Sequence, residues 1–219
     1  MNNAKTARGT VPQTLGMVQV ALFAALIIIL AFTPFLGYIP LGFTRATIIH
    51  IPVIIGCLML GPKKGAFLGF VFGLTSLINN TINPTATSFV FSPFYELGEI
   101  QGGIGSIVIC FLPRILVGIV PYYVYHGLHR LFKKNKTADT ACLAAAGVAG
   151  ALTNTLLVMN LIFVFFKDAY ASANNVASET VYTFILTIIG INGVPEAIVA
   201  GILVALICRV LFRTKYAVH

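Results

Sequence analysis

Five stretches of this chain are apolar enough and long enough to cross a lipid bilayer, and basic residues cluster at one end of each. A hydrocarbon core about 30 Å thick requires about 20 mainly apolar residues in a helix. Of the 219 residues, 58% are hydrophobic and only 9% are charged, which is more apolar surface than a soluble domain of this length can bury. The sequence therefore predicts an all-α membrane protein.

The net charge of +8 raises the question of nucleic-acid binding. The basic residues lie in short clusters between apolar runs rather than along one face, which is the pattern of the positive-inside rule. We therefore expect no nucleic-acid partner. The four cysteines lie far apart inside apolar runs without metal-ligand spacing, so they are interpreted as small buried residues. No metal and no cofactor is predicted.

The apolar runs predict one transmembrane substrate-binding domain over residues 1–219, with residues 1–15 as a short cytoplasmic segment. The last apolar region contains Asn192-Gly193-Val194-Pro195, which predicts a break with Asn192 as N-cap and Pro195 in the first helical turn. Residues 181–191 are then either an outer segment or the upper part of the last span. The six predicted spans are 16–34, 46–60, 64–79, 104–125, 142–166 and 195–212.

The charges fix the predicted orientation of these spans. With the amino end inside, eleven of the fourteen basic residues face the cytoplasm, whereas Arg45 and Lys167 fall outside and Arg114 falls within a span. This bias predicts a six-helix bundle with both termini cytoplasmic. The outer connections, 80–103 and 167–180, are long and are predicted to cover the outer mouth as a lid. The inner basic residues are Lys5, Arg8, Lys63, Lys64, Arg130, Lys133, Lys134, Lys136, Arg209, Arg213 and Lys215.

Polar residues on five different spans fall at a similar depth. Counted from the inner charges at about 1.5 Å per residue, they lie about 20–27 Å above the inner boundary, in the outer half of the bilayer. Buried charges at such depth are costly and normally face a cavity or a partner. Two interpretations remain: an internal Arg114–Glu196 ion pair cross-linked by amides, or an externally open binding cavity, which we favour. The five polar residues at this depth are His50, Asn79, Arg114, Asn154 and Glu196.

Small residues four positions apart mark one face on three of the spans. The first span carries Ala21 and Ala25, the third carries Gly65, Gly69 and Gly73, and the last carries Ala197, Gly201 and Ala205. Such stripes let two helices approach closely. They predict either packing inside the bundle or a docking face for another membrane protein, and spacing alone leaves both open.

Three features of the sequence together resemble a known family: the six short spans, the Ala21/Ala25 pair and one continuous segment. The segment runs from Ile51-Pro52-Val53-Ile54-Ile55-Gly56 through Leu60-Gly61-Pro62-Lys63-Lys64-Gly65-Ala66-Phe67-Leu68-Gly69. These features are similar to those of the substrate-binding S components of energy-coupling factor (ECF) vitamin transporters. The resemblance covers essentially the whole chain, and its specific motifs lie between Ala21 and Gly73.

This resemblance implies a prokaryotic plasma-membrane protein that is not an enzyme. Such a protein binds a vitamin from outside, associates with a membrane scaffold subunit and two cytoplasmic ATPases, and topples in the bilayer to release its cargo. By the same resemblance, Ala21 and Ala25 form the scaffold-docking face. The binding site lies near the outer surface, between spans four to six and the outer loops.

The chain looks most like the pantothenate-type and riboflavin-type members, and we favour pantothenate. Arg114 is expected to bind the carboxylate of this anion, with Arg45 as the rival candidate. The site is further expected to include Glu196 and His50. The side chains of Asn79, Asn154 and Asn192 are expected to bond the amide and hydroxyl groups of the ligand. The aromatic residues Phe94 and Tyr95 are expected to close the lid. Riboflavin requires a flat slot lined by aromatic side chains, and 17 Phe and 8 Tyr keep that alternative open despite the absence of Trp.

Two other classes of protein compete with this interpretation. An intramembrane enzyme using Glu196 and His50 requires a second carboxylate or histidine at close helical spacing, which the sequence lacks. A free-standing facilitator or channel requires no ATPase partner, and uptake into vesicles without ATPases distinguishes it.

Overall fold

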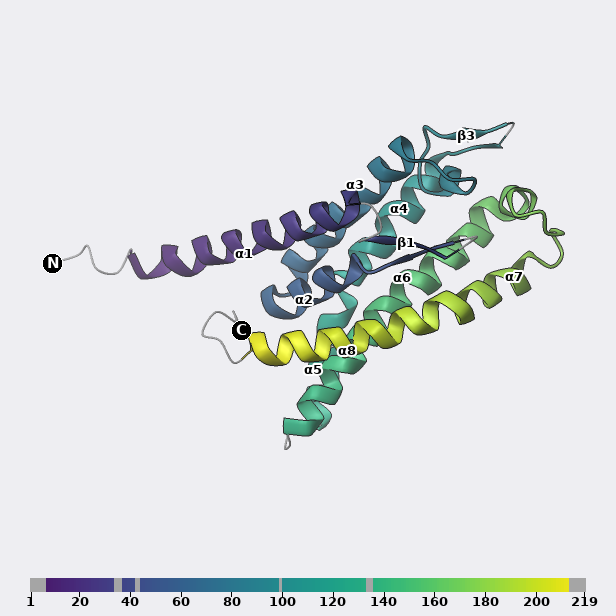
Figure 1. Ribbon diagram of the computed structural model, residues 1–219. Coiled ribbons are helices and arrows are strands. Elements are labelled where there is room, and N and C mark those ends of the chain that lie inside the picture. Colours follow the sequence, from purple (N-terminus) through teal and green to yellow (C-terminus); the bar gives the residue numbers. More distant parts are fainter. Residues whose placement is uncertain (1–6, 34–36, 42–43, 99, 133–135, 213–219) are drawn as a thin grey trace.

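A computed structural model describes residues 7–33, 37–41, 44–98, 100–132 and 136–212 (Figure 1). The side chains of residues 7–13, 38–41, 44–46 and 136–137 lie outside this description. Its helices form one elongated bundle, in which the start of α1 and the end of α8 lie at the same end. The helices are α1 Ala7–Phe32, α2 His50–Leu60, α3 Pro62–Ile82, α4 Ile104–Val117, α5 Val120–Leu131, α6 Lys136–Ala173, α7 Val181–Ile188 and α8 Val194–Leu211.

Within the described residues, five helical stretches are long and apolar enough to cross a membrane. They confirm the predicted membrane helical bundle. The remaining predicted span is the apolar helix α2, whose 11 residues extend only about 16 Å. Every residue of α2 is buried, so neighbouring helices rather than lipid surround it. The five stretches are Thr14–Phe32, Pro62–Ile82, Ile104–Leu131, Ala138–Ala173 and Val181–Leu211.

Short strands lie beside the helices at one end of the bundle. Strands β1 Tyr38–Leu41 and β2 Thr44–Thr47 form an antiparallel hairpin between α1 and α2. Between α3 and α4 the chain forms a 3₁₀ turn, Ser88–Val90, and the short strands β3 Glu96–Leu97 and β4 Ile100–Gln101. We call this the outer end, and the end with the α2–α3 turn at Lys63 the inner end, following the charge distribution.

The second and fourth predicted spans require correction. Residue 46 lies in β2 rather than in a helix, so span two begins at His50 instead of at residue 46. Predicted span four is divided into α4 and α5 at Gly118-Ile119, just before Pro121 in the first turn of α5. Proline has no N–H to continue the hydrogen-bond ladder, which explains the break.

The last two spans also differ from the prediction. Helix α6 continues past residue 166 to Ala173, with non-helical backbone angles at Phe166, so the first half of the expected loop 167–180 is helix. The predicted break at Asn192 is wrong, because a π-helical turn, Ile189–Gly193, carries α7 directly into α8. Residues 181–191 are therefore the upper part of the same span. Pro195 lies in the first turn of α8, as predicted.

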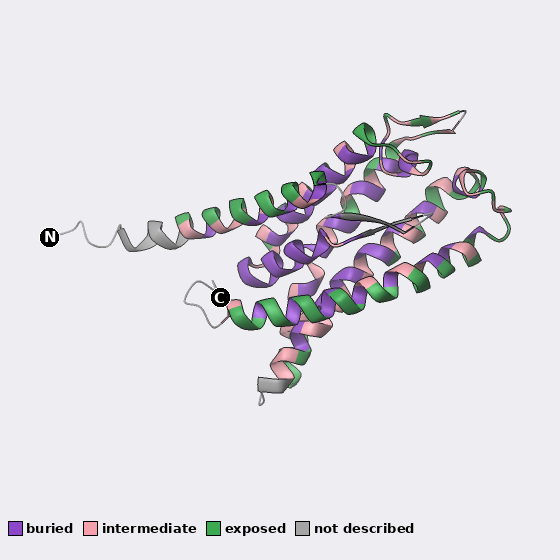
Figure 2. Cartoon of the chain, in the orientation of Figure 1, coloured by how far each residue is buried: buried purple, intermediate pink, exposed green. Residues whose placement is uncertain are grey.

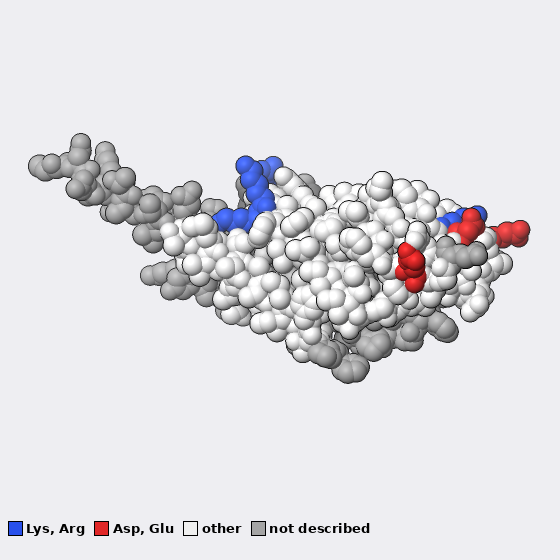
Figure 3. All heavy atoms as spheres, turned by 90° about the horizontal axis from the view of Figure 1, so that it is seen from above, with Lys and Arg blue, Asp and Glu red and all other residues white. Residues whose placement is uncertain are grey.

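The surface has the character expected in lipid. Large apolar side chains are exposed along the outward faces of α1 and α8, such as Leu22, Ile29, Ile202 and Leu206 (Figure 2). On the face drawn in Figure 3, basic side chains gather toward the end where α1 begins. The acidic side chains of that face lie toward the opposite end, next to further basic atoms. Five residues of the predicted inner set lie outside the described residues, and so do the side chains of Arg8 and Lys136. The five are Lys5, Lys133, Lys134, Arg213 and Lys215.

Two of the three small-residue stripes pack inside the bundle. A Cβ atom added at Gly65 would collide with the backbone of Gly118, and one added at Gly69 would collide with the backbone of Arg114. The stripe on α3 thus allows backbone-to-backbone contact with α4. On α8, Gly201 lies against Ala144 and Val148 of α6. In lipid the hydrophobic effect does not drive helices together, so close van der Waals packing at small residues such as these joins them instead.

The buried apolar residues form two clusters. The inner cluster surrounds α2 and joins it to α1, α3, α6 and α8, with Ile27, Ile54, Leu68 and Val204 among its members. The outer cluster joins the 3₁₀ turn to α4, α6 and α7, with Phe89, Ile109, Ile162 and Ile185 among its members.

Candidate binding cavity

A cavity of about 460 Å³ lies in the outer half of the bundle, within the range of about 300–1,000 Å³ typical of small-molecule sites. Its walls come from α3, α4, α6 and α8, the π-helical turn, the end of β2 and the loop after α3. The lining residues are Thr47, Ser76, Asn80, Thr85, Ala86, Thr87, Val90, Phe91, Arg114, Asn154, Thr155, Val158, Met159, Ile162, Tyr170, Ala173, Asn174, Asn175, Ile188, Asn192 and Glu196.

Arg114 supplies the positive charge of the cavity. It lies on α4 and is only 5% exposed. One guanidinium nitrogen donates a hydrogen bond to the carbonyl of Ile109, 2.6 Å away, so the side chain runs back toward the outer end of α4. The guanidinium carbon lies 5.6 Å from the ring centre of Phe72 and 5.1 Å from that of Phe91. Aromatic faces stabilise a cation and hold this one in place beside the cavity.

Glu196 supplies the negative charge from the first turn of α8. Its Oε1 atom accepts a hydrogen bond of 2.6 Å from the backbone N–H of Thr47, the last residue of β2. The carboxylate therefore fastens the β1–β2 hairpin to α8 across the sequence. The salt bridges between described residues include no Arg114–Glu196 pair. The predicted alternative of a dry internal ion pair is thus not observed.

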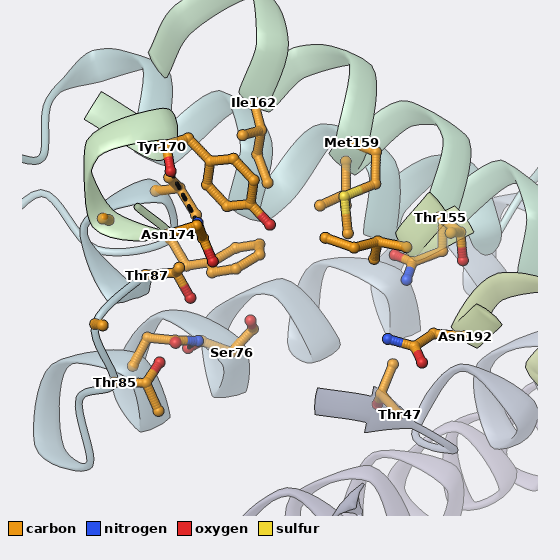
Figure 4. Close-up of a pocket in the computed structure, with 18 of the residues that line it drawn as sticks. Thr47, Ser76, Thr85, Thr87, Thr155, Met159, Ile162, Tyr170, Asn174 and Asn192 are labelled. Carbon is orange, nitrogen blue, oxygen red and sulfur yellow. Dashed lines mark hydrogen bonds between the residues drawn. The ribbon is translucent and has the colours of Figure 1, made fainter. Parts of the chain in front are cut away.

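Helix α6 lines the length of the cavity with one face. In Figure 4, Thr155 lies near Thr47 and Asn192 at one end, and Met159 and Ile162 follow along the wall. Tyr170 and Asn174 lie at the other end, where Thr85 and Thr87 of the loop after α3 face them. The cavity thus has two polar ends separated by an apolar middle.

Two buried side-chain oxygens of the cavity wall lack a hydrogen-bond partner among the described residues. They are Oδ1 of Asn154 on α6 and Oγ of Ser76 on α3. Leaving such a group unsatisfied costs about 1–3 kcal/mol. Because both residues line a cavity large enough for a small molecule, these atoms are positioned to bond a polar guest.

The polar groups of the outer rim mostly bond one another. Ser88 donates through its hydroxyl to Oδ1 of Asn80, 2.9 Å away, and accepts from the backbone N–H of Thr85 at 2.8 Å. The Asn174 side chain donates to the carbonyl of Tyr170 at 2.8 Å, which ends α6 with a fixed turn. Asn175 follows in the left-handed region with φ of 54°, a conformation that asparagine tolerates. This rim is preformed.

The structure brings together four of the residues predicted for the site. Arg114, Asn154, Asn192 and Glu196 all line the cavity, from α4, α6, the π-helical turn and α8. The side chain of Arg45, the rival candidate for the ligand carboxylate, lies outside the described residues.

Four predicted residues lie elsewhere. His50 is buried at the start of α2, and Asn79 on α3 accepts a hydrogen bond from the Asn83 side chain at 3.1 Å; neither lines the cavity. Tyr95 packs partly buried against the outer cluster, and Phe94 is 75% exposed, so neither closes over the cavity.

Sequence reasoning missed Ser76 and Asn80 on α3. The signal for them was present, because the small-residue face of Gly65, Gly69 and Gly73 continues one turn further to Ser76 and about two turns further to Asn80. The polar residues at the end of α6 were assigned to a loop and therefore were not counted. They are Tyr170, Asn174 and Asn175.

Comparison with known proteins identifies the family. Residues 16–208 match the family described as ECF transporter, substrate-specific component. The chain belongs to this family. The sequence-based resemblance is thereby confirmed over nearly the whole chain.

Two relatives of the chain carry more specific names. The chain is 38% identical over 199 residues to the "Pantothenic acid transporter PanT" of Lactococcus lactis subsp. cremoris, covering 89% of this chain and 92% of the relative. It is 30% identical over 204 residues to the "Pantothenate transporter PanT" of Leuconostoc mesenteroides, and the match covers 89% of this chain and 91% of the relative. The chain is thus a multi-pass plasma-membrane protein of a prokaryote, in a family of transporters rather than enzymes.

Proposed function

We propose that this ECF substrate-specific component captures pantothenate from outside the cell. It then delivers the vitamin inward with a transmembrane ECF scaffold subunit and two cytoplasmic ATPases. The two relatives named for pantothenate transport support the choice of vitamin. The buried Arg114 on the wall of an outer cavity is the observation that carries the proposal.

The chemistry of pantothenate matches this wall. The ligand is a singly charged carboxylate with one amide and two hydroxyls, joined by a compact apolar segment. An arginine binds a carboxylate through two parallel, charge-assisted hydrogen bonds. The unsatisfied oxygens of Asn154 and Ser76 suit the amide and hydroxyl groups, and Met159 and Ile162 offer an apolar surface between them.

Riboflavin suits the cavity less well. A flavin ring needs a flat slot between aromatic faces. Among the lining residues, Phe91 and Tyr170 are the aromatic side chains, and Phe91 already contacts the guanidinium of Arg114.

Titration of the purified protein by calorimetry tests the choice of ligand. We expect tight, saturable binding of pantothenate and no measurable binding of riboflavin. Mass spectrometry of small molecules released from the purified protein provides an independent check. Binding of riboflavin, or the absence of pantothenate binding under conditions where the protein is folded, would reject the proposal.

The scaffold subunit is proposed to dock on α1. Phe23 and Ile27 bury one face of this helix against the inner cluster, whereas Ala21 and Ala25 are exposed on another face. Unlike the stripes on α3 and α8, this small-residue pair is exposed within the part of the bundle that the structure describes. A flat exposed face suits close approach of a second membrane helix.

Ala21→Trp and Ala25→Trp test this assignment. Each should leave pantothenate binding unchanged while blocking co-purification with the scaffold and ATPases, because the indole prevents close helix contact. Ile202→Trp, at a 55% exposed position on α8, is the matched control and should permit assembly. If assembly survives tryptophan at both alanines, the docking face lies elsewhere.

A further inference from the structure

The two charged residues of the cavity stand on opposite walls. Helix α6 packs extensively against both α4, which carries Arg114, and α8, which carries Glu196, and so lies between them (Figure 1). Arg114 is held by the Ile109 carbonyl and the rings of Phe72 and Phe91. Glu196 is held by the backbone of Thr47. Since each charge has its own support, the cavity between them keeps a positive side and a negative side.

Only one of the two carboxylate oxygens of Glu196 accepts a hydrogen bond within the described part of the chain. Oε1 receives the N–H of Thr47 at 2.6 Å, and this bond fixes the orientation of the whole group. Oε2 receives no hydrogen bond from any part of the chain that the structure describes. An ionised carboxylate only accepts hydrogen bonds and has about four lone-pair directions. In its ionised form, Glu196 therefore presents a fixed, negatively charged acceptor to the cavity that it lines.

Such an acceptor discriminates between the two ends of a ligand like pantothenate. The ligand carboxylate carries no proton to donate, and its negative charge is repelled by Glu196 and attracted by Arg114. The hydroxyl end carries two O–H donors, which a carboxylate accepts in charge-assisted bonds.

We propose that Glu196 is a specificity-determining residue that binds the hydroxyl end of pantothenate, with the ligand carboxylate held at Arg114. This assignment rests on the proposed function. It gives Glu196 two tasks: one oxygen anchors the hairpin after α1, and the other recognises the diol. Ligands with a second negative charge in place of the hydroxyls are excluded by repulsion.

A thermodynamic cycle with ligand analogues tests the assignment. Wild type, Glu196→Ala and Glu196→Gln are titrated with pantothenate and with an analogue in which both hydroxyls are replaced by hydrogen. A hydrogen bond to a charged group corresponds to about 10- to 100-fold in affinity. We expect Glu196→Ala to weaken pantothenate binding by about that factor, and to change the affinity for the dideoxy analogue by less than about threefold.

The second variant separates recognition from anchoring. Glu196→Gln keeps an oxygen for the N–H of Thr47 but loses the charge and one acceptor, so it should weaken pantothenate binding by about tenfold with the hairpin in place. Pantothenol, which has an alcohol in place of the carboxylate, should show the same sensitivity to Glu196. Glu179→Ala, an exposed carboxylate outside the cavity, is the matched control.

Three outcomes would overturn the assignment. Unchanged pantothenate affinity in both variants would remove Glu196 from the site. Equal loss for pantothenate and the dideoxy analogue would make Glu196 a structural anchor only. A gain in affinity would mean that the ligand carboxylate faces Glu196. Failure of the wild type to bind pantothenate at all would instead reject the proposed function, so the two failures are distinguishable.

Discussion

The inner and outer halves of the bundle use buried space in opposite ways. In the inner half, α2 is buried on every side and apolar side chains fill the space around it. In the outer half, the same helices diverge around a cavity of about 460 Å³ whose wall carries an arginine, a glutamate and several amides. The packed inner half therefore stabilises the fold, and the outer half holds the proposed binding site. Changes in the two halves should therefore affect different measurements.

The largest effect on stability is expected from Ile54→Ala in the inner cluster. Ile54 is fully buried, and its side chain packs against Gly150 of α6. Deleting a buried side chain of this size costs about 2–5 kcal/mol, because a cavity remains where the contacts were. Thermal unfolding in detergent should show a lower midpoint. The affinity for pantothenate, measured well below that midpoint, should stay within about threefold.

Arg114→Ala should produce the largest effect on binding. Removing the guanidinium should weaken pantothenate binding by about 100-fold or more, because a buried carboxylate would lose its charge partner. Arg114→Lys should recover part of the affinity, since lysine keeps the charge without the two-pronged geometry. Isothermal titration measures both variants. Affinity within twofold of wild type for Arg114→Ala would show that the ligand lies elsewhere.

A smaller effect is expected from Asn154→Ala. The Oδ1 atom of Asn154 is buried at the cavity wall without a partner among the described residues, so its loss should weaken binding by about tenfold. The folded state should not be destabilised through this atom, because it has no internal bond to lose. Asn160→Ala, on the exposed face of the same helix, is the matched control. If both variants bind pantothenate alike, Asn154 does not contact the ligand.

Much of the fold could be predicted from sequence because lipid imposes strong constraints. The apolar runs gave the helices, and the charge at Lys63 and Lys64 gave their direction. Counting depth from those charges also placed Arg114 and Glu196 at a common level, and both residues line the same cavity. Depth is set by the rise along a helix, so it is readable from residue numbers alone.

Rotation about the helix axis was harder to predict. Asn79 and Asn80 are neighbours in sequence, but successive residues on a helix point about 100° apart, and only Asn80 lines the cavity. His50 belongs to α2, which is surrounded by protein rather than by the cavity. The backbone irregularities differed in how well they could be predicted. The break before Pro121 was a readable signal, whereas the continuity through the π-helical turn depends on packing of α7 and α8 against α6.

The most direct test of the central claim is an experimental structure of the purified protein with pantothenate bound. The account predicts ligand density between α4, α6 and α8, with the ligand carboxylate against Arg114 and the hydroxyls against Glu196. Pantothenate bound outside this cavity, or a collapsed cavity with Arg114 paired directly to Glu196, would contradict it.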